Sequence, residues 1–351
     1  MNLISAIKKV RRKLNARGQM FFSRRRAHAA RKKIIQHKGG SVVDRKTKRE
    51  IKSYAKERFG SSSFWPWLAV YTELRGEFIP GWIPHDYYKY ILLHKYNPEK
   101  AQISEYKTFD FRMFPNFALQ PLLVKIGPNY YDEDNRKLSA VQARELLRDH
   151  KGEVVVKKDL SGKGHQVYFV ESRELNLEDY AHIPSYIIQP VIEQAKQLQL
   201  FSRKSVNTVR VFTFLDKKGE AQVKYAILRF GLGDSRVDNI SSGGGYVFVN
   251  PSGFLDKEAY NKIGISIGDR HPENGVLFES VRVPNYRAMV DKCRQCHEQF
   301  PYLKIIGWDV AVNQRGEPVL LEWNSTPVFG FQEALIGPMF KKEDFKCITP
   351  K

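Results

Sequence analysis

Residues 305 to 324 constrain the fold of this chain more than any other stretch. Two apolar segments, 305–312 and 317–324, flank the polar turn Asn313-Gln314-Arg315-Gly316, which is the pattern of a β-hairpin. The segments carry Asp309, Glu322 and Asn324. Strand side chains return to one face every second residue, so a register that sets Asp309 opposite Glu322 gathers all three. Oxygen-bearing groups on an apolar hairpin need a partner when buried, and Mg²⁺ is the natural one. A solvated hairpin end is the alternative.

The positive charge of the chain lies almost entirely at its start. Residues 1–60 hold 20 Lys and Arg against 3 Asp and Glu, so they carry +17 of the formal net charge of +20. A helical stripe of apolar residues runs through this segment: Leu3, Ile7, Val10 and Leu14. A basic amphipathic helix suits an anionic membrane surface. Nucleic acid is the less favoured partner, and a solvated extension is the third alternative. We expect residues 1–38 to be separable from the body of the protein.

Other whole-chain features indicate where the protein works. Three cysteines favour a reducing compartment, and no run of 18 apolar residues spans a membrane. No apolar segment of the secretory type follows the basic start. We therefore expect a cytoplasmic location, peripheral to the inner face of the membrane where the basic segment binds lipid. Cys293 and Cys296 share a helical spacing with Met289 and Phe300, which favours a core face over a metal site.

Five further segments between residues 61 and 230 have recognisable patterns. An aromatic, proline-rich piece at 61–105 predicts a small subdomain. Residues 152–170 have the pattern of a strand, a glycine-rich turn and a second strand. Lys157 lies on the first strand, and the backbone N–H groups of a turn with Gly162 and Gly164 could cover phosphate. Pro190 interrupts the apolar segment 186–193, as in a hinge. Two further strands, 207–214 and 223–230, each carry one embedded arginine, which requires an anionic partner if buried: Arg210 and Arg229.

The order of these signals resembles the ATP-grasp superfamily, and most closely its sugar-transfer-associated branch. The likeness covers roughly residues 106–335. It rests on Ser205 to Arg210, on Leu228-Arg229 with Asp238-Asn239 and Gly243-Gly244, and on Gly307-Trp308-Asp309 with Glu322-Trp323-Asn324. The resemblance implies an α+β, two-lobed fold with ATP between antiparallel-sheet lobes, preceded by a basic helical N-terminal segment. The domains we expect are 1–60, 61–105, an N-lobe at 106–190 and a C-lobe at 191–351.

The resemblance also implies roles for individual residues. Lys157 would be the family's second nucleotide lysine. The position of the first holds Arg112, with Lys125 as a less well spaced candidate. Gly162 and Gly164 would belong to the phosphate-covering loop, and Gln189 to Val191 to the hinge that binds adenine. Mg²⁺ would be held by the hairpin side chains: Asp309, Glu322 and Asn324.

The activity implied is that of an ATP-dependent carboxylate–amine ligase acting through an acyl phosphate. Arg210 and Arg229 would hold the acceptor carboxylate and the transferring phosphoryl group. The substrates would be carboxylates and amines, small or sugar-linked, in cell-surface polysaccharide or glycoconjugate modification. An ATP-dependent kinase acting on a hydroxyl group, and a non-catalytic membrane-surface adaptor, are the alternatives.

Overall fold

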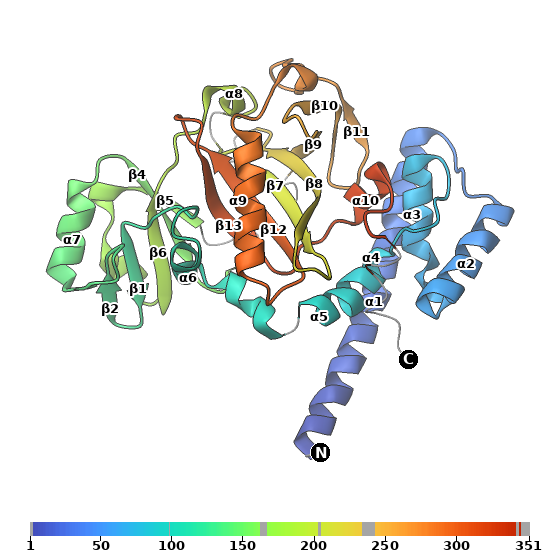
Figure 1. Cartoon of the computed structure of the whole chain (residues 1–351), viewed down its shortest axis with the longest axis horizontal. Coiled ribbons are helices and arrows are strands. Elements are labelled where there is room, and N and C mark those ends of the chain that lie inside the picture. Colours follow the sequence, from blue (N-terminus) through green and yellow to red (C-terminus); the bar gives the residue numbers. More distant parts are fainter. Residues whose placement is uncertain are drawn as a thin grey trace. The chain divides into compact units, whose positions relative to one another are not determined.

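The computed structural model describes residues 3–97, 99–161, 167–202, 205–233, 243–341 and 344, with side chains described from residue 18 onward except at 99 and 100. The chain divides into two compact units (Figure 1). Unit 1 combines the two ends of the chain with a short internal piece: Met1–Pro98, Lys262–Ile265 and Val328–Lys351. Unit 2 contains the remainder: Glu99–Asn261 and Ser266–Pro327.

Unit 1 is helical. Its helices are α1 (Leu3–Lys38), α2 (Arg45–Phe59), α3 (Trp65–Arg75), α4 (His85–Tyr87), α5 (Leu93–Tyr96) and α10 (Gly330–Ile336). The Asp44 side chain caps the start of α2 by accepting from the Thr47 N–H, and Gly60, with φ of 78°, ends it. Helices from both ends of the chain contribute to one hydrophobic core, which includes Ala27, Ile34, Ile51, Ala55, Trp67, Leu68, Tyr71, Trp82 and Ala334.

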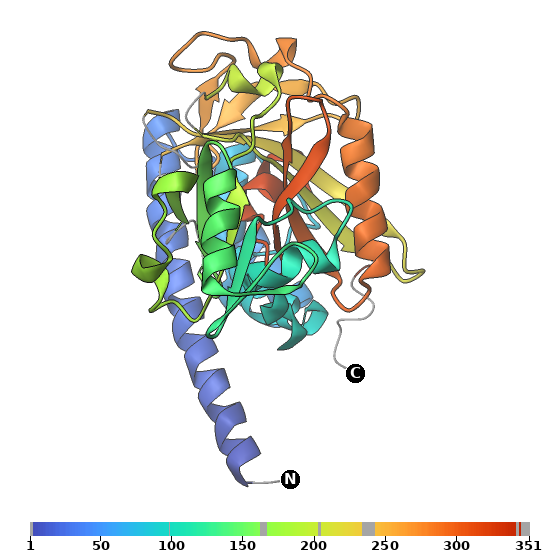
Figure 2. The same cartoon turned by 90° about the vertical axis from the view of Figure 1, so that its left-hand side faces the viewer.

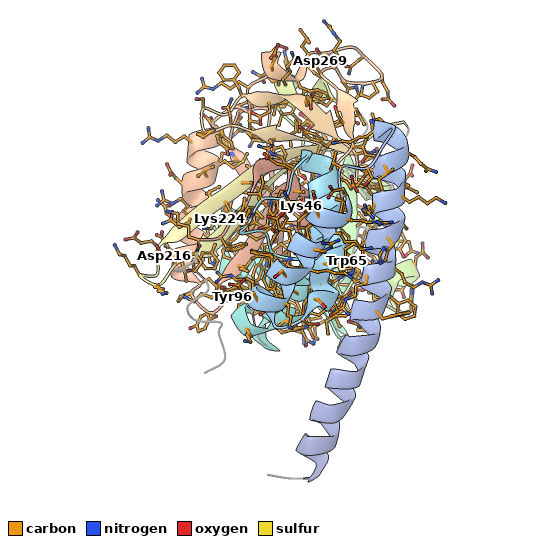
Figure 3. The ribbon with its side chains drawn as sticks, turned by 90° about the vertical axis from the view of Figure 1, so that its right-hand side faces the viewer. Lys46, Trp65, Tyr96, Asp216, Lys224 and Asp269 are labelled. Carbon is orange, nitrogen blue, oxygen red and sulfur yellow. The ribbon has the colours of Figure 1, made fainter. Side chains whose placement is uncertain are left out.

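The second half of α1 is part of this core, so the expectation that residues 1–38 form a separable extension is wrong for that half. Ala27 and Ile34 are fully buried. Arg24 pairs with the buried Asp86 at 2.9 Å, and Arg31 with the buried Glu73 at 2.7 Å. Deleting α1 would leave two carboxylates buried without cations, which is costly. Figure 3 shows Trp65 beside α1, where its ring lies 5.5 Å from that of His28. The predicted boundary at residue 60 falls inside this unit.

Unit 2 contains two antiparallel sheets, as the α+β, two-lobed fold class predicts. The smaller sheet has the order β3-β2-β1-β6-β4-β5. Its strands are β1 (Leu123–Ile126), β2 (Asn129–Tyr131), β3 (Lys137–Leu138), β4 (Glu153–Lys158), β5 (Val167–Glu171) and β6 (Ser185–Pro190). Helix α7 (Ala140–Asp149), which begins with a capping box formed by Ser139 and Gln142, packs on this sheet (Figure 2).

The larger sheet has the order β11-β10-β9-β8-β7-β12-β13. Its strands are β7 (Val209–Leu215), β8 (Ala221–Phe230), β9 (Gly245–Val249), β10 (Leu255–Tyr260), β11 (Ser266–Gly268), β12 (Ile305–Val312) and β13 (Pro318–Asn324). Helix α9 (Tyr286–Gln299) covers one face, with Met289 and Cys293 in the core as predicted (Figure 1). The short helices α6 (Lys107–Met113) and α8 (Lys196–Gln199) complete the unit. No helix in the described ranges is both long and apolar enough to cross a membrane.

Candidate functional site

The predicted hairpin is present and supplies the carboxylates of the site. Strands β12 and β13 pair with Asp309 directly opposite Glu322, and with Gly307 opposite Asn324. The intervening tryptophans, Trp308 and Trp323, are fully buried in the core. Because side chains alternate along a strand, anchoring the tryptophans on one face turns the acidic residues to the other. The hairpin prediction is therefore confirmed, including its register.

Two arginines from neighbouring strands hold Asp309. Arg210 on β7 lies opposite Asp309 in the sheet and donates to both carboxylate oxygens, with 2.6 Å between Nη2 and Oδ2. The Nη2 of Arg229 on β8 lies 3.2 Å from Oδ2. Burial alone would raise the pKa of Asp309, but the two guanidinium groups outweigh it and hold the pKa below its usual value. Arg229 also donates to the Thr208 hydroxyl at 2.6 Å, which fixes its orientation.

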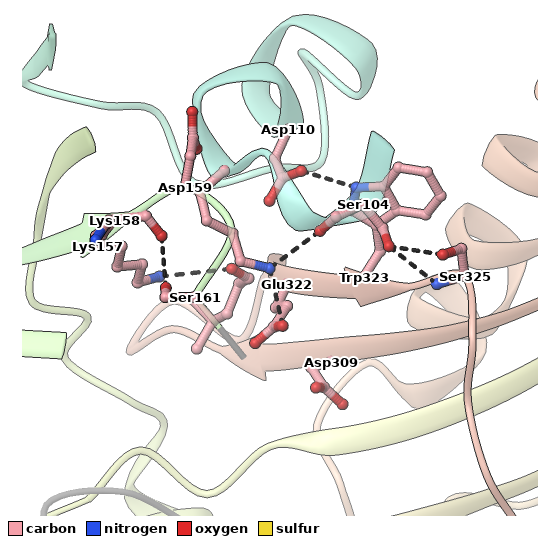
Figure 4. Close-up of polar contacts among 12 residues, drawn as sticks. Ser104, Asp110, Lys157, Lys158, Asp159, Ser161, Asp309, Glu322, Trp323 and Ser325 are labelled. Atoms are coloured by element: carbon pink, nitrogen blue, oxygen red, sulfur yellow. Dashed lines mark hydrogen bonds and ion pairs between the residues drawn. The ribbon is translucent and has the colours of Figure 1, made fainter. Parts of the chain in front are cut away.

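Helix α6 brings two residues to the site that the sequence reasoning did not identify. Lys107 Nζ donates to Glu322 Oε1 at 2.8 Å and to the Ser104 carbonyl at 3.2 Å. Figure 4 labels these two acceptor residues. Burial lowers the pKa of Lys107, but the Glu322 and Asp110 carboxylates raise it by more than burial lowers it. The net shift of the pKa is upward. Asp110 accepts from Trp323 Nε1 at 2.8 Å. Lys107 and Asp110 stand at i and i+3, which places both on one helix face, but this spacing does not indicate which strand the face meets.

Lys157 approaches this cluster from the smaller sheet. It is partly buried on β4, and its ammonium lies 3.5 Å from the Leu321 carbonyl (Figure 4). Burial, with a smaller contribution from the Lys107 cation, lowers its pKa to about 8, although the Glu322 and Asp110 carboxylates act in the opposite direction. The neighbouring carboxylates thus offset only part of the cost of desolvating the Lys157 cation. The adjacent turn residues Gly162 and Gly164 lie outside the described residues.

The end of β4 is tied to the start of α6. Asp159 accepts from the Thr108 backbone N–H at 3.0 Å and from the Thr108 hydroxyl at 2.7 Å. Thr108 follows Lys107, and Asp159 lies two residues after Lys157. This pair of hydrogen bonds therefore fixes the two lysines relative to each other.

The structure does not bring the two candidates for the first lysine to this cluster. Arg112 donates to the Asn135 side chain and stacks on Phe111, 5.1 Å from the ring centroid. Lys125 lies opposite Tyr186 in the sheet, whereas Lys157 lies opposite Ile187. Since Tyr186 and Ile187 are consecutive in β6, the two lysines project from opposite faces. Lys125 instead donates to the carbonyls of Ala181 and Ile183, at 3.3 and 2.5 Å.

Gln189 and Val191, which were expected to bind adenine, lie at the end of β6 and just beyond it. Gln189 is opposite Val155, two residues from Lys157, so its side chain shares the Lys157 face. The Gln189 amide donates to the Leu119 carbonyl at 2.7 Å. The Val191 backbone N–H donates to the Glu153 carbonyl at 3.2 Å.

The hairpin oxygens form a donor set of the kind that a hard cation prefers. Glu322 is 39% exposed and uses one oxygen for Lys107. Its other oxygen, and the Asn324 side chain, make no hydrogen bond with the described part of the chain. Both Asp309 oxygens are engaged by arginine. Among the described residues, no group of three or more His, Cys, Asp or Glu side chains is arranged to hold a metal ion, so the hairpin set reaches three donors only with the Asn324 amide. The donor set therefore fits Mg²⁺, with Glu322 and Asn324 as its most available members.

Comparisons with known proteins identify the family of this chain. No curated protein sequence matches the chain. The ATP-grasp ligase PsnB, solved with minimal precursor, Mg and ADP, aligns at 13% identity and a TM-score of 0.39, over 68% of this chain and 55% of that one. The biotin carboxylase domain of 2-oxoglutarate carboxylase from Hydrogenobacter thermophilus aligns at 10% identity and a TM-score of 0.39, over 64% and 40%. This chain thus spans little more than half of the first neighbour. The profile of the family described as sugar-transfer associated ATP-grasp matches residues 141–342, more than half of the chain. The chain belongs to that family.

Proposed function

We propose that this protein is an ATP-dependent carboxylate–amine ligase that forms an acyl phosphate on a sugar-linked or small carboxylate substrate. Its site would serve polysaccharide or glycoconjugate assembly. The family's description as sugar-transfer associated supports the sugar part of the proposal.

The observation that carries the proposal is an excess of positive charge in one partly buried cluster. Two carboxylates pair with cations of this cluster, Glu322 with Lys107 and Asp309 with Arg210 and Arg229, whereas Lys157 forms no ion pair within the described residues. A third, Asp110, has its pKa raised to about 7 by burial, so near neutral pH it is only partly ionised. Uncompensated cations in such an environment are costly without an anionic ligand. Nucleotide phosphates together with a carboxylate substrate supply the missing negative charge.

The roles follow from position. Lys157 and Lys107 would neutralise the phosphates, and Gln189 with Val191 would contact the base at the end of β6. Arg229, with Arg210, would hold the acceptor carboxylate against the γ-phosphate. Bound Mg²⁺, held by Glu322, Asn324 and Asp309, would neutralise phosphate charge.

The two steps balance in atoms and charge. A carboxylate oxygen bonds to the γ-phosphorus and ADP leaves. An amine nitrogen then attacks the acyl carbon, phosphate leaves and the nitrogen loses a proton. The residues of the protein position the reactants and compensate charge; the nucleophiles belong to the substrates.

An ADP-release screen tests the proposal. Uronic acids and amino acids are crossed pairwise with ATP and Mg²⁺. ADP release that requires both a carboxylate and an amine supports the ligase, whereas release with hydroxyl acceptors alone supports the kinase alternative.

Lysine variants test the nucleotide site. Lys107→Met and Lys157→Met should each raise the ATP dissociation constant about tenfold or more, the worth of one charge-assisted hydrogen bond. Lys125→Met is the matched control, since it removes the same charge from the opposite face of the sheet. An unchanged ATP affinity in both site variants would contradict the assignment.

A further inference from the structure

Helix α1 has two chemically different faces. The face packed in unit 1 consists of small and apolar residues at i, i+4, i+7 and i+11: Ser23, Ala27, Ala30 and Ile34. On the other side, Phe21 and Phe22 are 58% and 61% exposed. Leaving two adjacent phenylalanines in water is unfavourable, because moving their apolar surface from water into a nonpolar environment would lower the free energy. This outward face therefore exposes apolar side chains that a nonpolar partner could bury.

The basic residues of α1 also divide between the packed face and the exposed face. The helix contains 13 Lys and Arg and no Asp or Glu. Arg24 and Arg31 turn inward and are neutralised by Asp86 and Glu73. Of the other five cations in the described part of α1, Lys38 donates to the Leu74 carbonyl at 2.7 Å. The remaining four are exposed and form no ion pair with an acidic side chain in the described ranges: Arg25, Arg26, Lys32 and Lys33.

Helix α2 extends this positive surface. Lys48 and Lys52 lie over the Trp65 ring, at 4.7 and 5.6 Å from its centroid, and His28 of α1 contacts the same ring. The pKa of His28 is lowered by burial and then by the Arg31 and Lys48 cations, which indicates a positive local potential. The exposed charge is therefore shared by two helices and is not confined to one run of residues.

We propose that the outward face of α1, centred on Phe21, Phe22, Arg25 and Lys32, binds the surface of a membrane that contains anionic phospholipid. Basic side chains meet the lipid phosphates, while the two rings enter the boundary between headgroups and acyl chains. In the sequence, Phe21 also continues the helical spacing of Leu3, Ile7, Val10 and Leu14. The residues of this face all belong to unit 1, and the proposal does not depend on the proposed reaction.

Charge complementarity favours this occupant over two others. A second copy of α1 would bring 13 cations against 13 with no acidic residue between them. Duplex nucleic acid would satisfy the cations, but its phosphate backbone offers no apolar surface for Phe21 and Phe22. A lipid surface satisfies both kinds of group.

Vesicle sedimentation of the full-length protein tests the proposal. Vesicles of phosphatidylcholine alone and with about 30% phosphatidylserine are compared at about 50 and about 500 mM salt. Phe21→Ser/Phe22→Ser should weaken binding to anionic vesicles about tenfold or more at both salt concentrations. Arg25→Gln/Lys32→Gln should weaken it about fivefold per residue at low salt, and much less at high salt.

Two matched controls come from unit 2. Val141→Ser removes an exposed apolar side chain from α7, and Lys257→Gln/Arg287→Gln removes two exposed cations. Neither should change vesicle binding, and all four variants should keep the wild-type circular dichroism spectrum. The proposal is overturned if the wild-type protein ignores anionic vesicles at low salt, or if the phenylalanine variant binds them normally. It is also overturned if duplex RNA binds more tightly than vesicles and is insensitive to Phe21 and Phe22.

Discussion

Replacing Asp309 by asparagine should destabilise unit 2 as well as stop turnover, because Asp309 is the counterion of two arginines. The change keeps the shape of the side chain and removes its negative charge. Arg210 and Arg229 then remain close together, with side chains only 15% and 16% exposed. Three contacts to the carboxylate are weakened or lost, including the 2.6 Å hydrogen bond from Arg210.

The magnitude follows from that geometry. Removing one member of a fully buried ion pair costs about 3–5 kcal/mol, and the partial exposure of the arginines reduces this. We expect a loss of about 2–4 kcal/mol in the free energy of unfolding. Arg210→Met/Asp309→Leu, which replaces one pair by apolar side chains, should recover at least about 1 kcal/mol relative to Asp309→Asn.

Urea denaturation followed by tryptophan fluorescence measures the effect, since Trp308 adjoins Asp309 and is fully buried. Val141→Ser, a surface change on α7, is the control for the unfolding assay. A loss below about 0.5 kcal/mol in Asp309→Asn would show that the arginines do not depend on this carboxylate, and the reasoning would fail. Normal ADP release in the same variant would remove Asp309 from the catalytic site.

Three further predictions concern the other charged groups. Glu322→Gln should abolish ADP release yet cost less than about 1 kcal/mol of stability by urea denaturation, because the Glu322 side chain is 39% exposed. The affinity for ATP, measured by calorimetry, should fall as pH rises from 7 to 9, because Lys157 has a pKa of about 8 and loses its proton, and Lys157→Met should remove that dependence. Burial raises the pKa of Asp110 to about 7, so protonation of this carboxyl stabilises the folded state. The full stabilisation is present below about pH 4, near the ordinary pKa of aspartate, and it is lost as pH rises through 7. The free energy of unfolding should fall by at most about 1.4 kcal/mol per pH unit. Asp110→Asn should lack this loss in denaturation experiments at pH 5 and pH 8.

The parts of the fold that depend on local signals could be predicted from the sequence. The hairpin combines apolar segments with a Gly-containing turn, and the structure has it with Asp309 opposite Glu322. The capping box at Ser139 and Gln142 is equally local. Arg210 and Arg229 were identified because an arginine in an apolar strand needs an anion, and the structure supplies Asp309.

The packed half of α1 was missed because its charge dominated the interpretation. Thirteen cations suggested a solvated or lipid-bound helix along its whole length. The inward face was nevertheless present in the spacing of Ser23, Ala27, Ala30 and Ile34. Small residues give a weak hydrophobic signal, and the carboxylates that neutralise Arg24 and Arg31 lie 62 and 42 residues away in the chain. Such a long-range pairing has no local signature.

The position of Lys107 could not be read from sequence spacing because it follows from how the larger sheet ends. Strand β13 is an edge strand, and an exposed edge leaves backbone groups unpaired. Residues 117–119 cover part of that edge: Leu119 donates to the Leu320 carbonyl at 2.9 Å, and Leu320 donates to the Phe117 carbonyl at 2.7 Å.

Helix α6 immediately precedes this covering segment, so it is brought to the same edge of the sheet. There Lys107 binds Glu322 from one face of β13, and Asp110 binds Trp323 from the other. Consecutive residues of the strand are thereby held by residues one helical turn apart. The segment that covers the sheet edge thus also positions Lys107 beside Glu322. The position of this cation therefore depends on the register of the hairpin.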